Sequence, residues 1–132
     1  YTTLFRSITD PGRRALLDAV VARYRAVQPR LAAELANVTF HQPSVPVIAN
    51  VTARAHDDLT AMKDLLVQQV CAPVRWEESI RGLVAQGFTR FIELGPGKAL
   101  SGFLKRIAPE AACHNVADVP SLTTTAAALQ AA

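Results

Sequence analysis

The stretch from Phe91 to Leu104 constrains the fold of this 132-residue chain more than any other part. A short run dense in large apolar residues stops at Gly95-Pro96-Gly97 and restarts at Lys98 as a helical pattern. This pattern is typical of a buried strand that turns into a helix at the carboxyl edge of a sheet. Because α/β proteins keep their chemistry at that edge, the stretch is the first place to look for a site.

The apolar spacing predicts helices that alternate with strands. Helices are expected at residues 10–35, 57–70, 74–86, 98–107 and 121–129, and strands at 45–52, 88–94 and 113–116. Strands separated by helices of ten or more residues indicate parallel pairing through crossovers. The predicted fold class is therefore α/β with a parallel sheet, preceded by a long helix.

Several polar residues and one proline predict where helices begin or break. Asp10, followed by a proline, is expected to cap the first helix, and Asp57-Asp58 and Ser121 to cap two later ones. Pro29 lies inside the first helix and removes a backbone donor there. We therefore expect a kink or a break near Gln28.

The net charge of +3 is concentrated at the front of the chain. Residues 1–36 hold six arginines against three acidic residues, whereas residues 37–132 hold eight basic and eight acidic residues. The basic residues lack interleaved aromatic side chains and a known reading motif, so no nucleic-acid partner is predicted. The simplest interpretation of these arginines is the solvated face of a helix.

Composition also predicts the compartment. No window approaches the roughly 18 uninterrupted apolar residues that a membrane span needs, so no membrane association is expected. Cys71 and Cys113 match no metal spacing or redox pair and are expected to be reduced, buried thiols. We therefore expect a soluble protein of the cytoplasm.

The turn Gly95-Pro96-Gly97-Lys98 admits two interpretations. Free amides at a helix start attract anions, which would suit a phosphate. The turn lacks the length and spacing of the known phosphate-binding loops, however. A tight strand-to-helix turn that needs the conformational freedom of glycine is the favoured interpretation.

No nucleophile stands out in the sequence. The Gly-x-Ser-x-Gly elbow of α/β hydrolases and acyltransferases does not occur, and His41, His56 and His114 share no ligand spacing, so neither a catalytic triad nor a metal site is predicted. The acidic pairs at residues 57–58 and 77–78 are interpreted as first-turn or capping charges. Gln69 falls on the apolar face of its helix, and a buried amide there implies either a structural network or a functional contact.

Five segments in order nevertheless resemble the C-terminal part of bacterial malonyl-CoA:acyl-carrier-protein transacylases. They are Val38-Thr39-Phe40, residues 45–52 (Val-Pro-Val-Ile-Ala-Asn-Val-Thr), residues 65–70 (Leu-Leu-Val-Gln-Gln-Val), residues 73–79 (Pro-Val-Arg-Trp-Glu-Glu-Ser) and residues 93–107, which begin Glu-Leu-Gly-Pro-Gly-Lys. The resemblance runs from about Leu31 to the last residue. It places residues 26–132 in the C-terminal part of an acyltransferase domain and leaves residues 1–25 as an unplaced segment, mostly helix.

The resemblance implies a fold and a reaction. The family has a three-layer, α/β-hydrolase-like large subdomain, of which this chain would supply the C-terminal portion. The implied reaction is transfer of malonyl from coenzyme A, through an acyl-serine, to the phosphopantetheine thiol of an acyl carrier protein in fatty acid or polyketide biosynthesis. No cofactor is implied, and malonyl-CoA is a substrate.

Three candidate site features carry over from the resemblance. Gln69 matches the family glutamine that helps to hold the catalytic histidine, and Asn50 falls at a position that lines or supports the substrate site. The turn Gly95, Pro96, Gly97 and Lys98 would shape the same site as a structural turn.

The chain also departs from the family. The family elbow, Gly-His-Ser-Leu-Gly, and the arginine for the malonyl carboxylate find no match, and the catalytic histidine is absent where residues 18–22 read Asp-Ala-Val-Val-Ala. His41 lies at a variable loop position and does not replace it. We therefore expect the isolated chain to be inactive.

Two further interpretations stay open. The chain could be a non-catalytic module that binds a carrier protein or coenzyme A, offering its basic helix to an acidic carrier through Arg13, Arg14, Arg23, Arg25 and Arg30. It could also form a full enzyme with a second chain that bears the elbow. In each case, uncovered strand edges predict self-association of the isolated chain.

Overall fold

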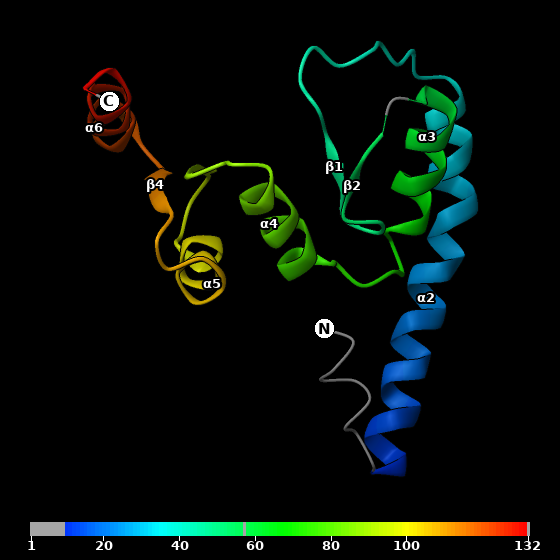
Figure 1. Cartoon of the computed structure of the whole chain (residues 1–132). Helices are drawn as coiled ribbons and strands as arrows, with labels where there is room; N and C mark the ends of the chain where they lie inside the picture. Colours follow the sequence, from blue (N-terminus) through cyan, green and yellow to red (C-terminus); the bar gives the residue numbers. More distant parts are fainter. Residues whose placement is uncertain (1–9, 57, 132) are drawn as a thin grey trace. The chain divides into compact units, whose positions relative to one another are not determined.

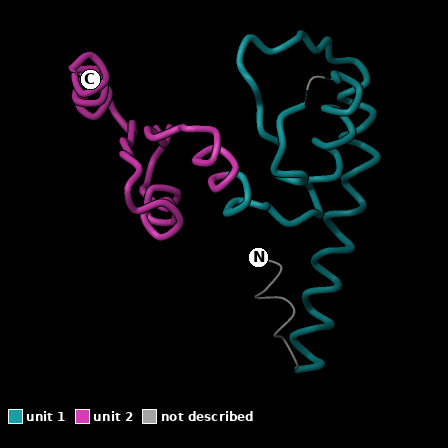
Figure 2. The backbone as a smooth tube through the Cα atoms, viewed as in Figure 1, with its two compact units in different colours: residues 1–79 teal, residues 80–132 magenta. Residues whose placement is uncertain are grey.

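The computed structural model of the chain describes residues 10–56 and 58–131. It divides into two compact units, residues 1–79 and residues 80–132 (Figure 2). The division falls inside a helix, and each unit is described by itself.

The first unit is built on a long helix, α2 (Pro11–Ala36) (Figure 1). Its N-cap is Asp10, whose carboxylate accepts a hydrogen bond from the Arg13 amide at 2.7 Å, as predicted. A kink or a break is predicted near Gln28, and the helix continues through Pro29 without a break. The adjacent Gln28 donates from its Nε2 to the Val67 carbonyl at 3.0 Å, a contact with the next helix beside the position where the proline removes a backbone bond. Neither α2 nor any other described helix is long and apolar enough to cross a membrane.

A short antiparallel hairpin follows α2. Strand β1 (Ile48–Ala49) pairs with β2 (Arg54–Ala55). The strand predicted at residues 45–52 is therefore too long, and its observed partner is antiparallel rather than parallel. The chain reverses because the Ala53 amide donates back to the Ala49 carbonyl at 2.9 Å, with Ala53 at a φ of 56°.

Helix α3 (Leu59–Gln68) packs against α2. Its N-cap is Asp58, which accepts hydrogen bonds from the amides of Thr60 and Ala61, whereas Asp57 lies outside the described residues. The helix ends two residues earlier than predicted, and Gln69 is its C-cap. This position matters because it takes Gln69 off the helix body and places it at the helix end.

The second unit contains the predicted parallel pair of strands. Helix α4 (Trp76–Ala85) crosses from the first unit into it and is followed by β3 (Arg90–Leu94), α5 (Ala99–Ile107), β4 (Ala112–Val116) and α6 (Val119–Gln130). Strands β3 and β4 pair in parallel, with Phe91 opposite Cys113 and Leu94 opposite Val116. The prediction of parallel strands joined by a crossover helix is confirmed here.

One predicted cap in this unit is wrong. Helix α6 is capped by Asp118 and not by Ser121. Asp118 accepts a hydrogen bond from the Ser121 amide at 2.9 Å, while the Ser121 hydroxyl accepts one from the Asp118 amide at 3.0 Å. Ser121 is thus the third residue of the helix in a reciprocal capping box, and Pro120 fits inside the first turn.

The apolar core of the described residues is small. Ile80 and Leu104 are only 4% and 2% exposed, and both belong to the second unit. Along β3, by contrast, Ile92 is 42% and Leu94 is 78% exposed. Parallel strands are normally covered on both faces, so one face of β3 is left uncovered by the residues that the structure describes.

Candidate functional site

The structure brings two of the predicted site residues together. Asn50 follows directly on β1, and Gln69 caps the end of α3. The Asn50 Nδ2 donates a hydrogen bond to the Gln69 Oε1 at 3.2 Å. Gln69 is half-buried rather than buried as predicted, and its partner is the other predicted amide. We call these two residues the amide pair.

The Gly95–Lys98 turn belongs to the second unit, whereas the amide pair belongs to the first. Gly95 and Gly97 have φ values of 128° and 94°, which only glycine adopts without strain, as the turn interpretation requires. Asn115 on β4 fastens the turn, because its Nδ2 donates to the Gly97 carbonyl at 2.8 Å. The neighbouring strand therefore holds the turn in its shape.

A carboxylate of the chain itself occupies the amides at the start of α5. The two Glu93 carboxylate oxygens accept hydrogen bonds from the Leu100 amide at 3.1 Å and from the Ser101 amide at 2.9 Å, and the Ser101 hydroxyl donates to the same carboxylate. The bond from the Ser101 hydroxyl, with the two amides, holds the pKa of Glu93 below its ordinary value. A phosphate at this helix start would have to displace Glu93, which favours the structural turn.

The Glu93 carboxylate predicts an acid-dependent stability. Because its pKa is lowered in the folded chain, its stabilisation is complete above the ordinary value of 4.5 and is lost as the pH falls through the lowered pKa. We expect Glu93→Gln to lower the urea midpoint at pH 7, and we expect the difference from wild type to shrink below about pH 4.5. Urea unfolding from pH 7 to pH 3 measures this. Glu110→Gln, which removes an exposed carboxylate that accepts no hydrogen bond from a described residue, is the matched control. A difference from wild type that stays constant with pH would contradict the assignment.

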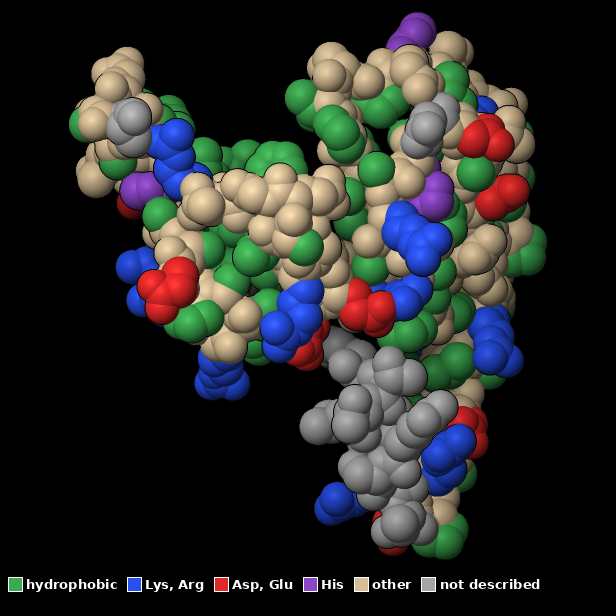
Figure 3. Space-filling view, viewed as in Figure 1, with side chains coloured by type: hydrophobic (Ala, Val, Ile, Leu, Met, Phe, Trp, Pro, Cys, Tyr) green, Lys and Arg blue, Asp and Glu red, His purple; other side chains and the backbone are tan. Residues whose placement is uncertain are grey.

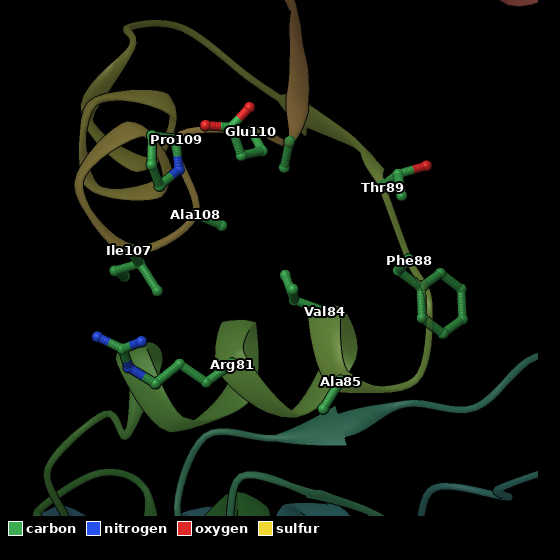
Figure 4. A pocket seen from close by; sticks show the side chains of 10 residues that line it. Arg81, Val84, Ala85, Phe88, Thr89, Ile107, Ala108, Pro109 and Glu110 are labelled. Atoms are coloured by element: carbon green, nitrogen blue, oxygen red, sulfur yellow. The ribbon is translucent and has the colours of Figure 1, made fainter.

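A cavity of about 370 Å³ lies elsewhere in the second unit. In Figure 4, Val84 of α4 and Ala108 after α5 face each other across it. Its lining is mostly apolar and comes from Arg81, Val84, Ala85, Phe88, Thr89 and residues 107–111. Since Thr89 precedes β3, the cavity lies at the amino end of that strand, whereas sites in α/β proteins lie at the carboxyl ends. It contains none of the predicted site residues.

The other candidates for chemistry are held in local contacts. The His56 Nε2 lies 2.7 Å from the Thr52 hydroxyl, and no described histidine ring is hydrogen-bonded to a serine or cysteine side chain. Cys71 and Cys113 are free thiols and are half-buried rather than buried. Glu77 and Glu78 lie in the first turn of α4, as predicted. Within the described residues, therefore, no serine or cysteine is paired with a histidine as a catalytic nucleophile would be.

Sequence reasoning missed two residues that shape these elements, Glu93 and Arg75. The usual capping pattern concerns the residue directly before a helix. Glu93 lies on the preceding strand β3, and its carboxylate accepts a hydrogen bond from the Leu100 amide of α5. Arg75 was part of a matching segment but carried no assigned role. It contacts the loop that carries Asn50 and forms an ion pair with Glu78.

Comparison with known proteins identifies relatives for part of the chain. No protein-family model matches it. The malonyl CoA-acyl carrier protein transacylase of Salmonella typhimurium is 46% identical over 78 residues, which are 59% of this chain and 25% of the relative. The chain thus spans about a quarter of the length of that curated relative.

Solved structures agree with this relationship. The acyl carrier protein S-malonyltransferase of Vibrio cholerae superposes with a TM-score of 0.72 at 40% identity, over 76% of this chain and 33% of the other. A type II PKS acyl-carrier protein in complex with its malonyl-transacylase, PlMCAT:AntF, gives a TM-score of 0.72 at 34% identity, over 76% and 32%. These enzymes confirm the α/β fold class. Over the matched residues the chain is therefore similar to the malonyl CoA-acyl carrier protein transacylases, a family of acyltransferases.

Proposed function

We propose that this chain is the C-terminal part of a malonyl-CoA:acyl-carrier-protein S-malonyltransferase and supplies one wall of its active site. The observation that carries the proposal is the hydrogen bond between Asn50 and Gln69. These residues are 19 positions apart in sequence, and the family resemblance assigns both to the site. In this arrangement residues 26–132 belong to a three-layer, α/β-hydrolase-like large subdomain.

The position of Gln69 suits a group that holds a catalytic histidine. Gln69 lies at the C-terminus of α3, where the partial negative charge of the helix end stabilises an imidazolium. The bond from Asn50 uses one of the two lone pairs of the Gln69 Oε1 and fixes the orientation of the side chain. A histidine held there could take the proton of an attacking serine and later return it, as acyl transfer through a serine requires.

The substrates and partner follow from the same proposal. The acyl donor is malonyl-CoA, and the acceptor is the phosphopantetheine thiol of an acyl carrier protein, a partner supported by the neighbour solved with its carrier. Because the sequence holds no serine elbow and no histidine at the expected position, the isolated chain is inactive.

A chimera tests the proposal. The 78 aligned residues of the Salmonella enzyme are replaced by those of this chain, and malonyl transfer from malonyl-CoA to a holo carrier protein is measured. We expect transfer by the chimera and none by the isolated chain. A chimera that folds and binds malonyl-CoA but transfers nothing would refute the proposal. If this chain alone then bound the carrier in a salt-sensitive manner that depends on the α2 arginines, the binding-module interpretation would replace it.

The uncovered face of β3 predicts self-association of the isolated chain. Apolar side chains are visible at the surface of both units (Figure 3). Leu94 on β3 is 78% exposed. Exposed apolar surface and unpaired strand edges promote association between copies. We expect concentration-dependent oligomers in analytical ultracentrifugation, reduced by Leu94→Lys but not by Glu110→Lys, a charge change at an exposed position off the strand. A monomer at every concentration would contradict this.

A further inference from the structure

We propose that Arg75 is a positioning residue of the candidate site, which holds the loop at residues 50–53 so that Asn50 meets Gln69. That Asn50 and Gln69 belong to a transacylase site rests on the proposed function. The arrangement itself is tested without measuring any activity.

Arg75 contacts Asn50 through its backbone. The Arg75 amide donates to the Asn50 carbonyl at 2.9 Å. Asn50 is thus held twice, by its side chain at the end of α3 and by its carbonyl just before the start of α4. The short link from Gln69 to Arg75 therefore contacts Asn50 at both of its ends.

The Arg75 guanidinium contacts both the loop and Glu78. The Arg75 Nη1 donates to the Thr52 carbonyl at 3.2 Å, two residues further along the same loop. The Nε donates to one Glu78 carboxylate oxygen at 2.8 Å, and the Nη2 donates to the other. This bidentate pair fixes the plane of the guanidinium. The third nitrogen, Nη1, is the one that donates to the loop. A lysine lacks this planar fork and could not make both contacts in the same geometry.

The loop at residues 50–53 needs contacts from outside to keep one conformation. The strands that flank it, β1 and β2, are two residues long each and supply few ladder bonds. Ala53 within the loop has a φ of 56°, a left-handed conformation that is strained for a residue with a Cβ. A loop with strain and little sheet support keeps one conformation only when outside contacts hold it. Arg75 supplies two of these contacts.

The experiment uses the full chain, labelled with ¹⁵N and ¹³C, and follows the side-chain amide of Asn50 by nuclear magnetic resonance. In wild type we expect a nuclear Overhauser contact between the Asn50 Nδ2 protons and the Gln69 side chain. In Arg75→Gln we expect loss of this contact while the thermal midpoint stays close to that of wild type. We expect Arg75→Lys not to restore it, because the fork is missing.

Two further variants make the result decisive. Arg54→Gln is the control, since Arg54 is an exposed arginine on β2 whose guanidinium makes no hydrogen bond to a described residue. Glu78→Gln keeps the Arg75 guanidinium but removes the carboxylate that orients it. If Arg75→Gln fails to fold, the same Asn50–Gln69 contact is measured in Glu78→Gln instead. Retention of the Asn50–Gln69 contact in Arg75→Gln, or in Glu78→Gln when that variant stands in for it, would overturn the proposal. Equal loss in Arg54→Gln would also overturn it. Because no transfer is measured, an inactive chimera would refute the function without affecting this result.

Discussion

Replacing Gln69 by alanine in the chimera lowers kcat for malonyl transfer by up to roughly 100-fold and changes KM little. Gln69 is proposed to orient the histidine rather than to bind the substrate, and a misplacement of about 1 Å in a catalytic group can cost 10²-fold in rate. Steady-state transfer of malonyl to a holo carrier protein gives both constants.

The adjacent glutamine provides a matched control for that variant. Gln68 is the last residue of α3 and is exposed, whereas Gln69 is half-buried and bonded to Asn50. Gln68→Ala makes the same chemical change one position away, so it should leave kcat near that of the chimera. Equal losses in the two variants would show that the helix end, and not the Gln69 amide, is responsible.

Replacing Leu104 by alanine destabilises the chain by about 2–5 kcal/mol, the range for a buried leucine. Leu104 on α5 is only 2% exposed, and few described apolar residues are as well buried. A chain with so small a core has little stability to lose, so this substitution should remove a large share of the free energy of unfolding. Urea unfolding followed by circular dichroism measures the change.

The control for that prediction lies on the same helix. Leu100 is 40% exposed, so Leu100→Ala removes the same atoms from a site that is partly in water. We expect it to cost less than half as much as Leu104→Ala. Similar losses at the two positions would mean that α5 is packed differently from the structure.

The second unit could be predicted well from the sequence. The boundaries of β3, α5 and β4 lie within two residues of expectation, because glycines, a proline and dense apolar runs mark them. The positive φ values of Gly95 and Gly97 were anticipated for the same reason. These signals are local, so the residues of each segment are sufficient to predict its boundaries.

The errors arose where distant residues decide the structure. The apolar run at residues 45–52 was interpreted as one strand, but the chain reverses after Ala49 and pairs with Arg54–Ala55. Pro29 predicts a kink or a break, but the helix does not break there, and the adjacent Gln28 is bonded to another helix 39 residues away. Neither contact leaves a periodic trace in the sequence.

The candidate site was predictable only in part. The resemblance assigned Asn50 and Gln69 to the site separately, and their hydrogen bond became visible only in the structure. The residues that support the site features were missed, because Arg75 and Glu93 act through loop carbonyls and helix amides that a side-chain motif does not encode. The roles of Asn50 and Gln69 in catalysis stay predictions.

The most direct test of the account is malonyl transfer by this chain with and without the rest of a transacylase. The part of the Salmonella enzyme outside the aligned 78 residues is supplied as a separate polypeptide, and malonyl attached to a holo carrier protein is measured by mass spectrometry. The account predicts no transfer by either polypeptide alone and transfer by their mixture, reduced when Gln69 is replaced by alanine. Transfer by this chain alone, or a stable but inactive complex of the two polypeptides, would contradict it.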